Sequence, residues 1–123
     1  MRYLLLFFLF LSDFAFSKPV NITLNDVREL SLKECLDINY LRLGKANSVE
    51  LNDKSYLLVW FSIDNDSTKK SKELKKFIKD NTGHYFMMKP PVKTSESNMI
   101  FSLCMRFYES DKLINYIENY VFD

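Results

Sequence analysis

Histidine, glycine and cysteine are scarce in this 123-residue chain. With one His and two Cys, it lacks the converging ligands that a zinc site takes from these residue types. With two Gly, it has no glycine-rich loop of the kind that binds phosphate groups. Its 17 Lys and Arg balance 16 Asp and Glu to a net charge of +1, which is not the basic surplus typical of nucleic-acid-binding proteins. We therefore expect no metal, no cofactor and no nucleic-acid partner.

The same scarcity argues against catalysis. A nucleophilic cysteine needs a neighbouring base, and His84 is the one histidine that could pair with Cys35 or Cys104. Both cysteines have a better use in a disulfide bond. No spacing among the Asp and Glu residues singles out a pair for general acid–base chemistry. The sequence therefore predicts a protein that is not an enzyme.

The most apolar segment lies at the N-terminus. Residues 4–11 are all apolar, and the small residues Ala15 and Ser17 follow them, which is the outline of a cleavable signal peptide. The run is shorter than the stretch of about 20 apolar residues that a membrane span needs. The alternative is a buried N-terminal helix or strand. We expect a signal peptide over residues 1–17 and one exported domain over residues 18–123, without a membrane span after cleavage.

Export gives the two cysteines a role. In an oxidising compartment, an even cysteine count in a small exported chain favours a disulfide bond. The pair Cys35–Cys104 would close a loop of roughly 70 residues, which the chain-entropy account values at about 4 kcal/mol. The alternative is two free, buried thiols.

Apolar residues at three- and four-residue steps predict four helices. They cover residues 24–43, a segment from a Ser67 or Thr68 cap through Asp80, residues 96–108 and residues 112–121. Asn21 or Thr23 supplies the expected N-cap of the first helix, Ser110 is the candidate N-cap of the last, and Gly44 is a candidate C-terminal stop. Six lysines between positions 69 and 79 are expected to form the solvated face of the second helix. The positions expected to face the core are Leu24, Val27, Leu30, Leu32, Cys35, Leu36, Tyr40, Leu43, Leu74, Phe77, Ile78, Met99, Ile100, Leu103, Cys104, Phe107, Leu113, Ile114, Ile117 and Tyr120.

Two segments lie outside this pattern. Residues Tyr56 to Ile63 are almost uninterruptedly apolar, and periodicity alone cannot separate a buried strand from a buried helix here. Asp53 or Ser55 could cap such a helix. Residues Asn81 to Ser95 carry one glycine and a Pro-Pro pair, which predicts an irregular, exposed loop. A loop this long is usually functional or disordered, and we expect it to carry binding while contributing little to folding.

Several short motifs resemble the periplasmic immunity proteins that neutralise type VI secretion amidases of the fourth amidase family. The segment from Cys35 to Tyr40 is similar to the family's cysteine, apolar residue, two variable or small residues and an aromatic. The segment from Leu103 to Leu113 resembles the family's Cys, Tyr, Ser and Leu spacing near the C-terminus. Between them, Leu58-Val59-Trp60 is similar to an aromatic helix of the family. This resemblance decides the segment 56–63 for helix.

The resemblance implies an all-α fold, a small single-domain bundle of about five helices with one intramolecular disulfide. It also implies a homodimer that binds a peptidoglycan amidase, a papain-like cysteine peptidase, in the periplasm. The family's inhibitory loop maps onto Asp80, Asn81, Thr82, Gly83, His84 and Tyr85, which we expect to enter the amidase's catalytic cleft. Two differences stand out: Ser48 to Asn52 replaces a small-residue stretch, and Met87 to Pro91 lengthens the loop. A second class of function is an exported inhibitor or adaptor for another cell-wall enzyme or envelope partner. A third is a small secreted effector or enzyme, which a free, reactive thiol would mark.

Overall fold

The computed structural model describes residues 21–45, 52–64, 69–91 and 97–122. Within them every regular element is helical: five α-helices, the 3₁₀ turn η2 and the π-helical turn η3, with no strand. The disulfide Cys35–Cys104 is formed. The all-α fold and the disulfide are thus confirmed. The predicted signal peptide over 1–17 and the Ser67 or Thr68 cap lie outside the described residues.

Helix α1 (Leu24–Arg42) is closed at both ends by the residues that the sequence singled out. Thr23 and Asp26 form a reciprocal capping box, in which each side chain accepts a backbone N–H of the other,. At the other end Gly44 has a φ of 70°. The N–H groups of Gly44 and Lys45 donate to the carbonyls of Leu41 and Tyr40. This left-handed stop favours glycine, because L side chains rarely adopt a backbone conformation with such a positive φ,.

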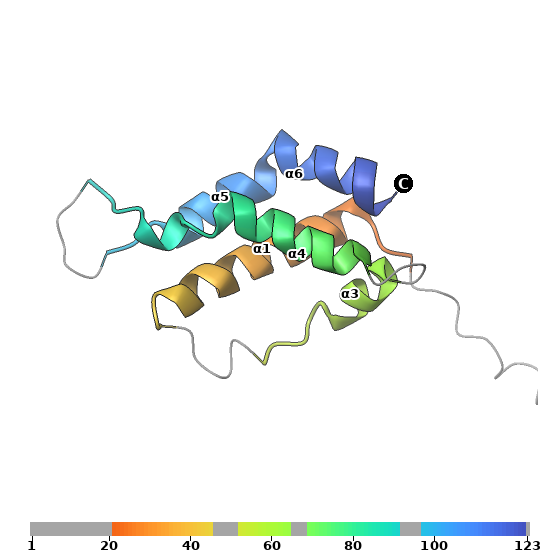
Figure 1. Cartoon of the computed structure of the whole chain (residues 1–123), viewed down its shortest axis with the longest axis horizontal. Coiled ribbons are helices and arrows are strands. Elements are labelled where there is room, and N and C mark those ends of the chain that lie inside the picture. Colours follow the sequence, from red (N-terminus) through yellow and green to blue (C-terminus); the bar gives the residue numbers. More distant parts are fainter. Residues whose placement is uncertain (1–20, 46–51, 65–68, 92–96, 123) are drawn as a thin grey trace, which may run out of the picture.

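Helix α1 lies between α4 (Lys69–Thr82) and α5 (Ile100–Glu109) and makes most of the helix contacts of the bundle. Figure 1 shows α1 and α4 running in one direction and α5 in the other. Cys35 of α1 and Cys104 of α5 join the two helices covalently, and both are fully buried. Arg28 adds a second tie, because its Nε donates to the Tyr108 carbonyl and its guanidinium lies 4.3 Å from the Tyr108 ring.

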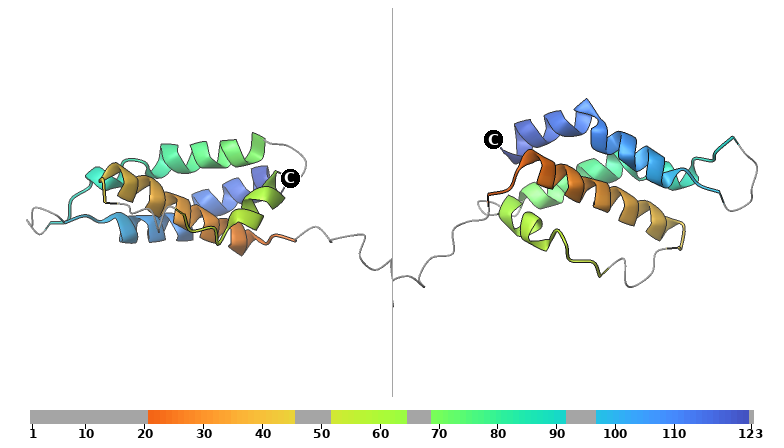
Figure 2. Two further views of the ribbon diagram at one scale, coloured as in Figure 1. Left: turned by 90° about the horizontal axis from the view of Figure 1, so that it is seen from below. Right: turned by 180° about the vertical axis from the view of Figure 1, so that it is seen from behind.

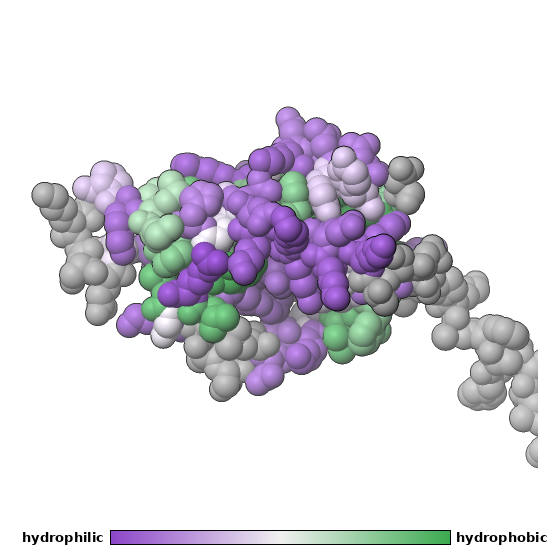
Figure 3. All heavy atoms as spheres, in the orientation of Figure 1, coloured by the Kyte–Doolittle hydropathy of each residue, from purple (hydrophilic) through white to green (hydrophobic). Residues whose placement is uncertain are grey.

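The core fills the space among α1, α4, α5 and the C-terminal helices. On α4 the apolar residues Leu74 and Ile78 are fully buried, while the lysines at 69, 72, 75, 76 and 79 are exposed. Phe77 stacks on Tyr116, with ring centroids 3.9 Å apart. The predicted solvated face of α4 is thus present except at Lys70, which is half-buried and donates to the Val121 carbonyl at 3.1 Å. Figure 3 shows this face as a hydrophilic band across the molecule. The buried apolar residues are Val27, Leu30, Cys35, Ile63, Leu74, Ile78, Ile100, Leu103, Cys104, Phe107, Leu113, Ile117 and Val121.

The last helical segment ends in an unexpected turn. Helix α6 (Asp111–Tyr116) starts from a Ser110 cap, as predicted, and continues as η3 (Ile117–Val121), where the N–H of Phe122 donates to the Ile117 carbonyl five residues earlier. Tyr120, expected in the core, is 63 % exposed, and Val121 is buried in its place. The wider π-helical turn rotates Tyr120 away from the inner face. The inward prediction for Tyr120 was wrong for this reason.

Helix α3 (Leu57–Ile63) corrects a second expectation. The segment is a helix, but of its seven residues only Ile63 is buried, and Leu58 and Phe61 are 64 % and 63 % exposed. Neither Asp53 nor Ser55 caps it. Instead the Asp53 carboxylate accepts hydrogen bonds from Ser55 in a turn before the helix. Figure 2 shows α3 at the side of the bundle, beside the start of α1.

Candidate functional site at the η2 end of the bundle

The predicted binding segment lies where α1 and α4 end and α5 begins, and we call this region the η2 end (Figures 1 and 2). The loop was expected to begin after Asp80, but α4 continues through Thr82. Thr82 and Gly83 are buried, whereas Asp80 and His84 are exposed. Asn81 is half-buried, and its Nδ2 donates to the Phe77 carbonyl. Thr82 and Gly83 therefore belong to the interior of the fold.

The chain then makes one 3₁₀ turn, η2 (Tyr85–Met87). Tyr85 and Phe86 are half-buried and pack against the hydrophobic core. The prediction that the segment is irregular from Asn81 onward and bound little to the core was wrong for its first half, residues 81–87. In its second half, residues 88–91 form no helix or strand. Residues 92–95 lie outside the described part of the chain.

A single buried side chain fixes η2 against α1 and α4. Asn39 of α1 is fully buried. Its Nδ2 donates to the carbonyls of Cys35 and Thr82, both at 2.9 Å, and its Oδ1 accepts the N–H of Phe86 at 2.9 Å. A side-chain amide has both donors and an acceptor. Asn39 can therefore pair with a backbone carbonyl at the end of α4 and with a backbone N–H in η2 at the same time. Buried backbone groups left without such a partner cost about 1–3 kcal/mol each.

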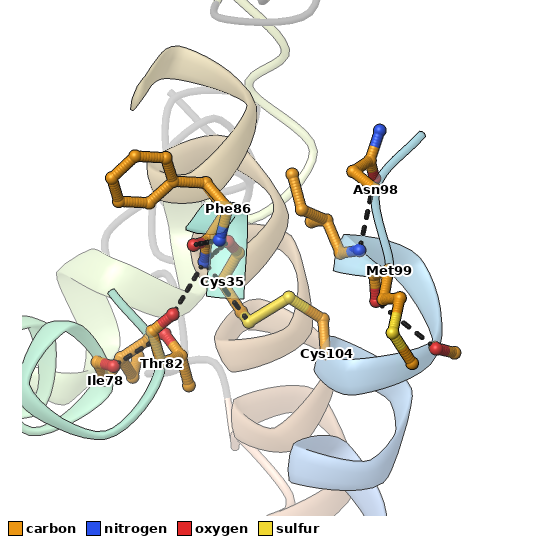
Figure 4. The surroundings of a disulfide bond; sticks show 10 residues. Cys35, Ile78, Thr82, Phe86, Asn98, Met99 and Cys104 are labelled. Carbon is orange, nitrogen blue, oxygen red and sulfur yellow. Dashed lines mark hydrogen bonds between the residues drawn. A yellow bond between two sulfur atoms is a disulfide. The ribbon is translucent and has the colours of Figure 1, made fainter. Parts of the chain in front are cut away.

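The disulfide lies directly beneath this amide. The Asn39 Nδ2 is 3.9 Å from the Cys35 Sγ, and Figure 4 shows Thr82, Phe86 and Cys35 gathered around the Cys35–Cys104 bond. The covalent tie between α1 and α5 and the hydrogen bonds of the turn therefore share one location. Movement of α1 relative to α5 would displace the support of η2.

Gly83 and Arg42 complete the anchor. A Cβ on Gly83 would lie 2.6 Å from the Lys79 carbonyl oxygen, so only glycine fits at this close approach,. The Nη1 of Arg42 donates to the Gly83 carbonyl at 2.7 Å, and its guanidinium lies 5.5 Å from the Phe86 ring. These contacts lock the backbone from the last turn of α4 into η2.

The anchored turn presents an exposed, partly apolar surface. Met87 is 61 % exposed, and exposed apolar side chains of the neighbouring helix ends accompany it. In Figure 3 a hydrophobic area covers the η2 end and a second one covers α3. The large exposed apolar residues of the η2 end are Leu41, Met87, Met88 and Phe101, and the exposed His84 lies beside them.

Tyr85 occupies the edge of this surface. Its ring meets the His84 ring edge-on, with centroids 4.9 Å apart. Burial raises the pKa of the Tyr85 phenol above its ordinary value,. Like any tyrosine hydroxyl at physiological pH, it is protonated and can donate a hydrogen bond. The residue is thus half anchor and half contact surface, which suits a position that must be held rigidly.

No group of three His, Cys, Asp or Glu side chains that could hold a metal occurs among the described residues. None of their helices is long and apolar enough to cross a membrane.

Sequence reasoning missed Asn39 and Arg42 as supports of the site. A signal for Asn39 exists, because it stands four residues after Cys35 and therefore on the core-facing side of α1. A polar residue on such a face must find buried partners. No comparable pattern marks Arg42, whose partner lies 41 positions away.

No protein-family model, curated protein or solved structure matches this chain.

Proposed function

We propose that the chain is a periplasmic immunity protein. It binds a type VI secretion peptidoglycan amidase with its η2 end, blocks the catalytic cleft sterically and carries out no catalysis of its own. The motifs around Cys35, Trp60 and Cys104 suggest the family, and the disulfide is consistent with the oxidising periplasm,.

The observation that carries the proposal is a rigid turn with an exposed tip. Asn39, Arg42 and the disulfide hold the backbone of residues 82–86, while His84 and Met87 remain exposed. A segment that is already ordered loses little conformational entropy on binding. Such a turn is suited to enter a concave site and exclude a substrate from it.

The resemblance also suggests a homodimer. Leu58 and Phe61 of α3 expose apolar surface away from η2, so self-association through α3 would leave the η2 end accessible to the amidase. Sedimentation of the purified protein over a range of concentrations tests this part separately.

The test is an inhibition assay with purified peptidoglycan and the cognate papain-like amidase. The double variant His84→Ala/Met87→Ala removes two exposed side chains of the tip without touching the anchor. We expect its affinity for the amidase to fall by about 1–3 kcal/mol, the cost of losing an interface anchor.

The matched control is Leu58→Ala/Phe61→Ala, which removes exposed apolar side chains from α3 instead. It should inhibit as the wild type does, and both variants should keep the wild-type melting temperature. Full inhibition by the His84→Ala/Met87→Ala variant, with loss in the α3 variant, would move the binding surface to α3. Absence of any amidase binding by the wild type would favour the second class, an inhibitor or adaptor for another envelope partner.

A further inference from the structure

A small hollow lies beside η2, where α5 turns into α6. Its volume is about 270 Å³, and Figure 2 shows the α5–α6 corner that forms one of its walls. Tyr85 of η2 and Asn81 of α4 face two residues of α5 and two at the start of α6. The lining residues are Asn81, Tyr85, Arg106, Phe107, Ser110 and Lys112.

The charge of this hollow is of one sign. Arg106 and Lys112 line it, and neither has an ion pair or a hydrogen bond within the described part of the chain, although Glu109 and Asp111 stand close by in the sequence. Elsewhere lysines do pair with nearby carboxylates, as Lys76 does with Asp80 at 2.6 Å. The two cations of the hollow are therefore available to an external anion.

Tyr85 adds a neutral donor. Its hydroxyl has no hydrogen-bond partner among the described residues, and its ring is fixed by packing against the core. The Ser110 hydroxyl is already used, since it donates to the Phe107 carbonyl and accepts the Leu113 N–H. Asn81 uses its Nδ2 on the Phe77 carbonyl. The remaining charged or phenolic groups of the hollow are a guanidinium, an ammonium and a phenol, and each of these can donate.

We propose that this hollow binds a carboxylate side chain, an Asp or Glu, on the surface of the protein that the η2 turn engages. A guanidinium forms paired hydrogen bonds with the two oxygens of a carboxylate. The hollow adjoins the exposed tip, because the Tyr85 and His84 rings are in contact. A protein seated on the tip would therefore cover the hollow and shield the ion pair from water. The identity of the partner rests on the proposed function. The preference for a carboxylate rests on the hollow alone.

The first experiment measures binding of the full mature chain to the amidase. Arg106→Gln/Lys112→Gln removes the two charges, and Tyr85→Phe removes only the hydroxyl. We expect the double variant to bind about 10- to 100-fold more weakly and Tyr85→Phe about tenfold more weakly, as for hydrogen bonds to charged groups. The double variant should also lose most of the salt dependence of the association rate. The charge-matched control Lys72→Gln/Lys75→Gln, on the exposed face of α4, should behave as the wild type.

The second experiment needs no amidase. In an NMR titration of the labelled wild type, the capped peptide acetyl-Gly-Glu-Gly-amide should shift the amide signals of Tyr85, Arg106 and Lys112 in a saturable way. The analogue with Gln in place of Glu should not. Saturable shifts with inorganic phosphate and none with the Glu peptide would overturn the proposal in favour of a free-anion site.

The two proposals fail separately. Wild-type binding of the amidase by Arg106→Gln/Lys112→Gln would refute the carboxylate site and leave the proposed function intact. No amidase binding by the wild type, together with saturable shifts by the Glu peptide, would refute the proposed function and support the carboxylate site for another protein partner. Melting curves identify any variant that has not folded.

Discussion

The two ends of the bundle both expose apolar side chains, but they are built in different ways. At the η2 end, fully buried groups hold the chain, namely Asn39 and the Cys35–Cys104 bond. At the α3 end, Ile63 is buried, but the polar ties lie at the surface or are half-buried. The Tyr56 hydroxyl donates to Glu29, and the Lys75 ammonium lies 4.7 Å from the Trp60 ring.

The supports at the η2 end fix the position of the chain, whereas those at the α3 end only hold the helix against the bundle. Buried hydrogen bonds leave one arrangement of the chain, because every alternative strands a donor or an acceptor. Surface pairs of the kind around α3 contribute about 0–1 kcal/mol and permit several arrangements. An exposed apolar tip on the first kind of support is suited to a fixed interface, and α3 is suited to adjustment.

The largest effect is expected from removing the disulfide. In Cys35→Ala/Cys104→Ala, loss of a cross-link over 69 residues should cost about 4 kcal/mol and lower the melting temperature by roughly 15 °C or more. Urea unfolding of the variant and of the wild type measures it. A stability unchanged within error would mean that packing alone holds α1 against α5.

Asn39→Leu should rank second. The variant keeps the approximate volume but leaves the Thr82 carbonyl and the Phe86 N–H without their partner, which should cost about 3 kcal/mol. Amide hydrogen exchange should show faster exchange at Phe86 than in the wild type. The matched control is Ser62→Ala on α3, whose hydroxyl donates to the Leu58 carbonyl, and its cost should stay within about 0.5 kcal/mol. Equal losses in the free energy of unfolding in the two variants would show that the two ends of the bundle are not supported differently.

Gly83→Ala should follow, because its Cβ would meet backbone 2.6 Å away. We expect a loss of about 2 kcal/mol, as for overpacking at a closed position. Gly44→Ala has open space around it and should cost about 1 kcal/mol through its left-handed backbone alone. Thermal unfolding of both variants compares a glycine required by a close contact, at position 83, with one required by its backbone conformation, at position 44. A milder effect at position 83 than at 44 would show that α4 can shift to make room.

Leu58→Ser/Phe61→Ser should leave the free energy of unfolding within about 0.5 kcal/mol of the wild type, since both side chains are exposed,. Denaturant unfolding at low protein concentration measures this. Sedimentation of the same variant tests α3 as the self-association surface: if the wild type is a dimer through this face, the variant should be a monomer. A variant that remains dimeric would place the dimer contact elsewhere.

The smallest effect concerns Glu34, which lines a hollow of about 320 Å³ between α1 and the α3 segment. Burial raises the pKa of its carboxyl, with Lys75 acting in the opposite direction. An acid with a raised folded-state pKa binds more protons folded than unfolded, so stability falls as the pH rises from the unfolded-state pKa through the folded-state pKa. Glu34→Gln should therefore be slightly more stable than the wild type at neutral pH, and this gain should vanish in acid. A gain that is independent of pH would point to packing rather than to the charge.

Much of the fold follows from local patterns. The Thr23 cap, the Gly44 stop, the Ser110 cap and the inward faces of α1 and α5 obey rules that act within a few residues. The disulfide was predicted from the cysteine count together with the expectation of export. The predicted burial of Tyr120 was wrong because nothing in the sequence marks the π-helical turn. The predicted burial of α3 was wrong because an apolar run does not reveal how much neighbouring surface there is to cover it.

The site was only partly predictable, for a similar reason. Proline and glycine content marked the segment after α4 as irregular, but the supports of η2 come from α1, more than 40 positions earlier. Such long-range hydrogen bonds leave no periodic trace. The sequence could therefore locate the segment and name His84 and Tyr85, but it could not separate the buried Thr82 and Gly83 from the exposed tip.

The anchoring of η2 by Asn39 bears on how long the turn survives beside a hydrolase. Proteolytic cleavage of a folded chain requires local opening into an extended segment, and its rate follows the population of the opened form. Opening residues 82–86 breaks the hydrogen bonds of Asn39 and Arg42 and lifts Tyr85 and Phe86 from the core. The opened form should therefore be rare, and under the proposed function the tip should resist digestion in a peptidase cleft. The same buried amide that positions the turn would keep it intact as a non-cleavable plug.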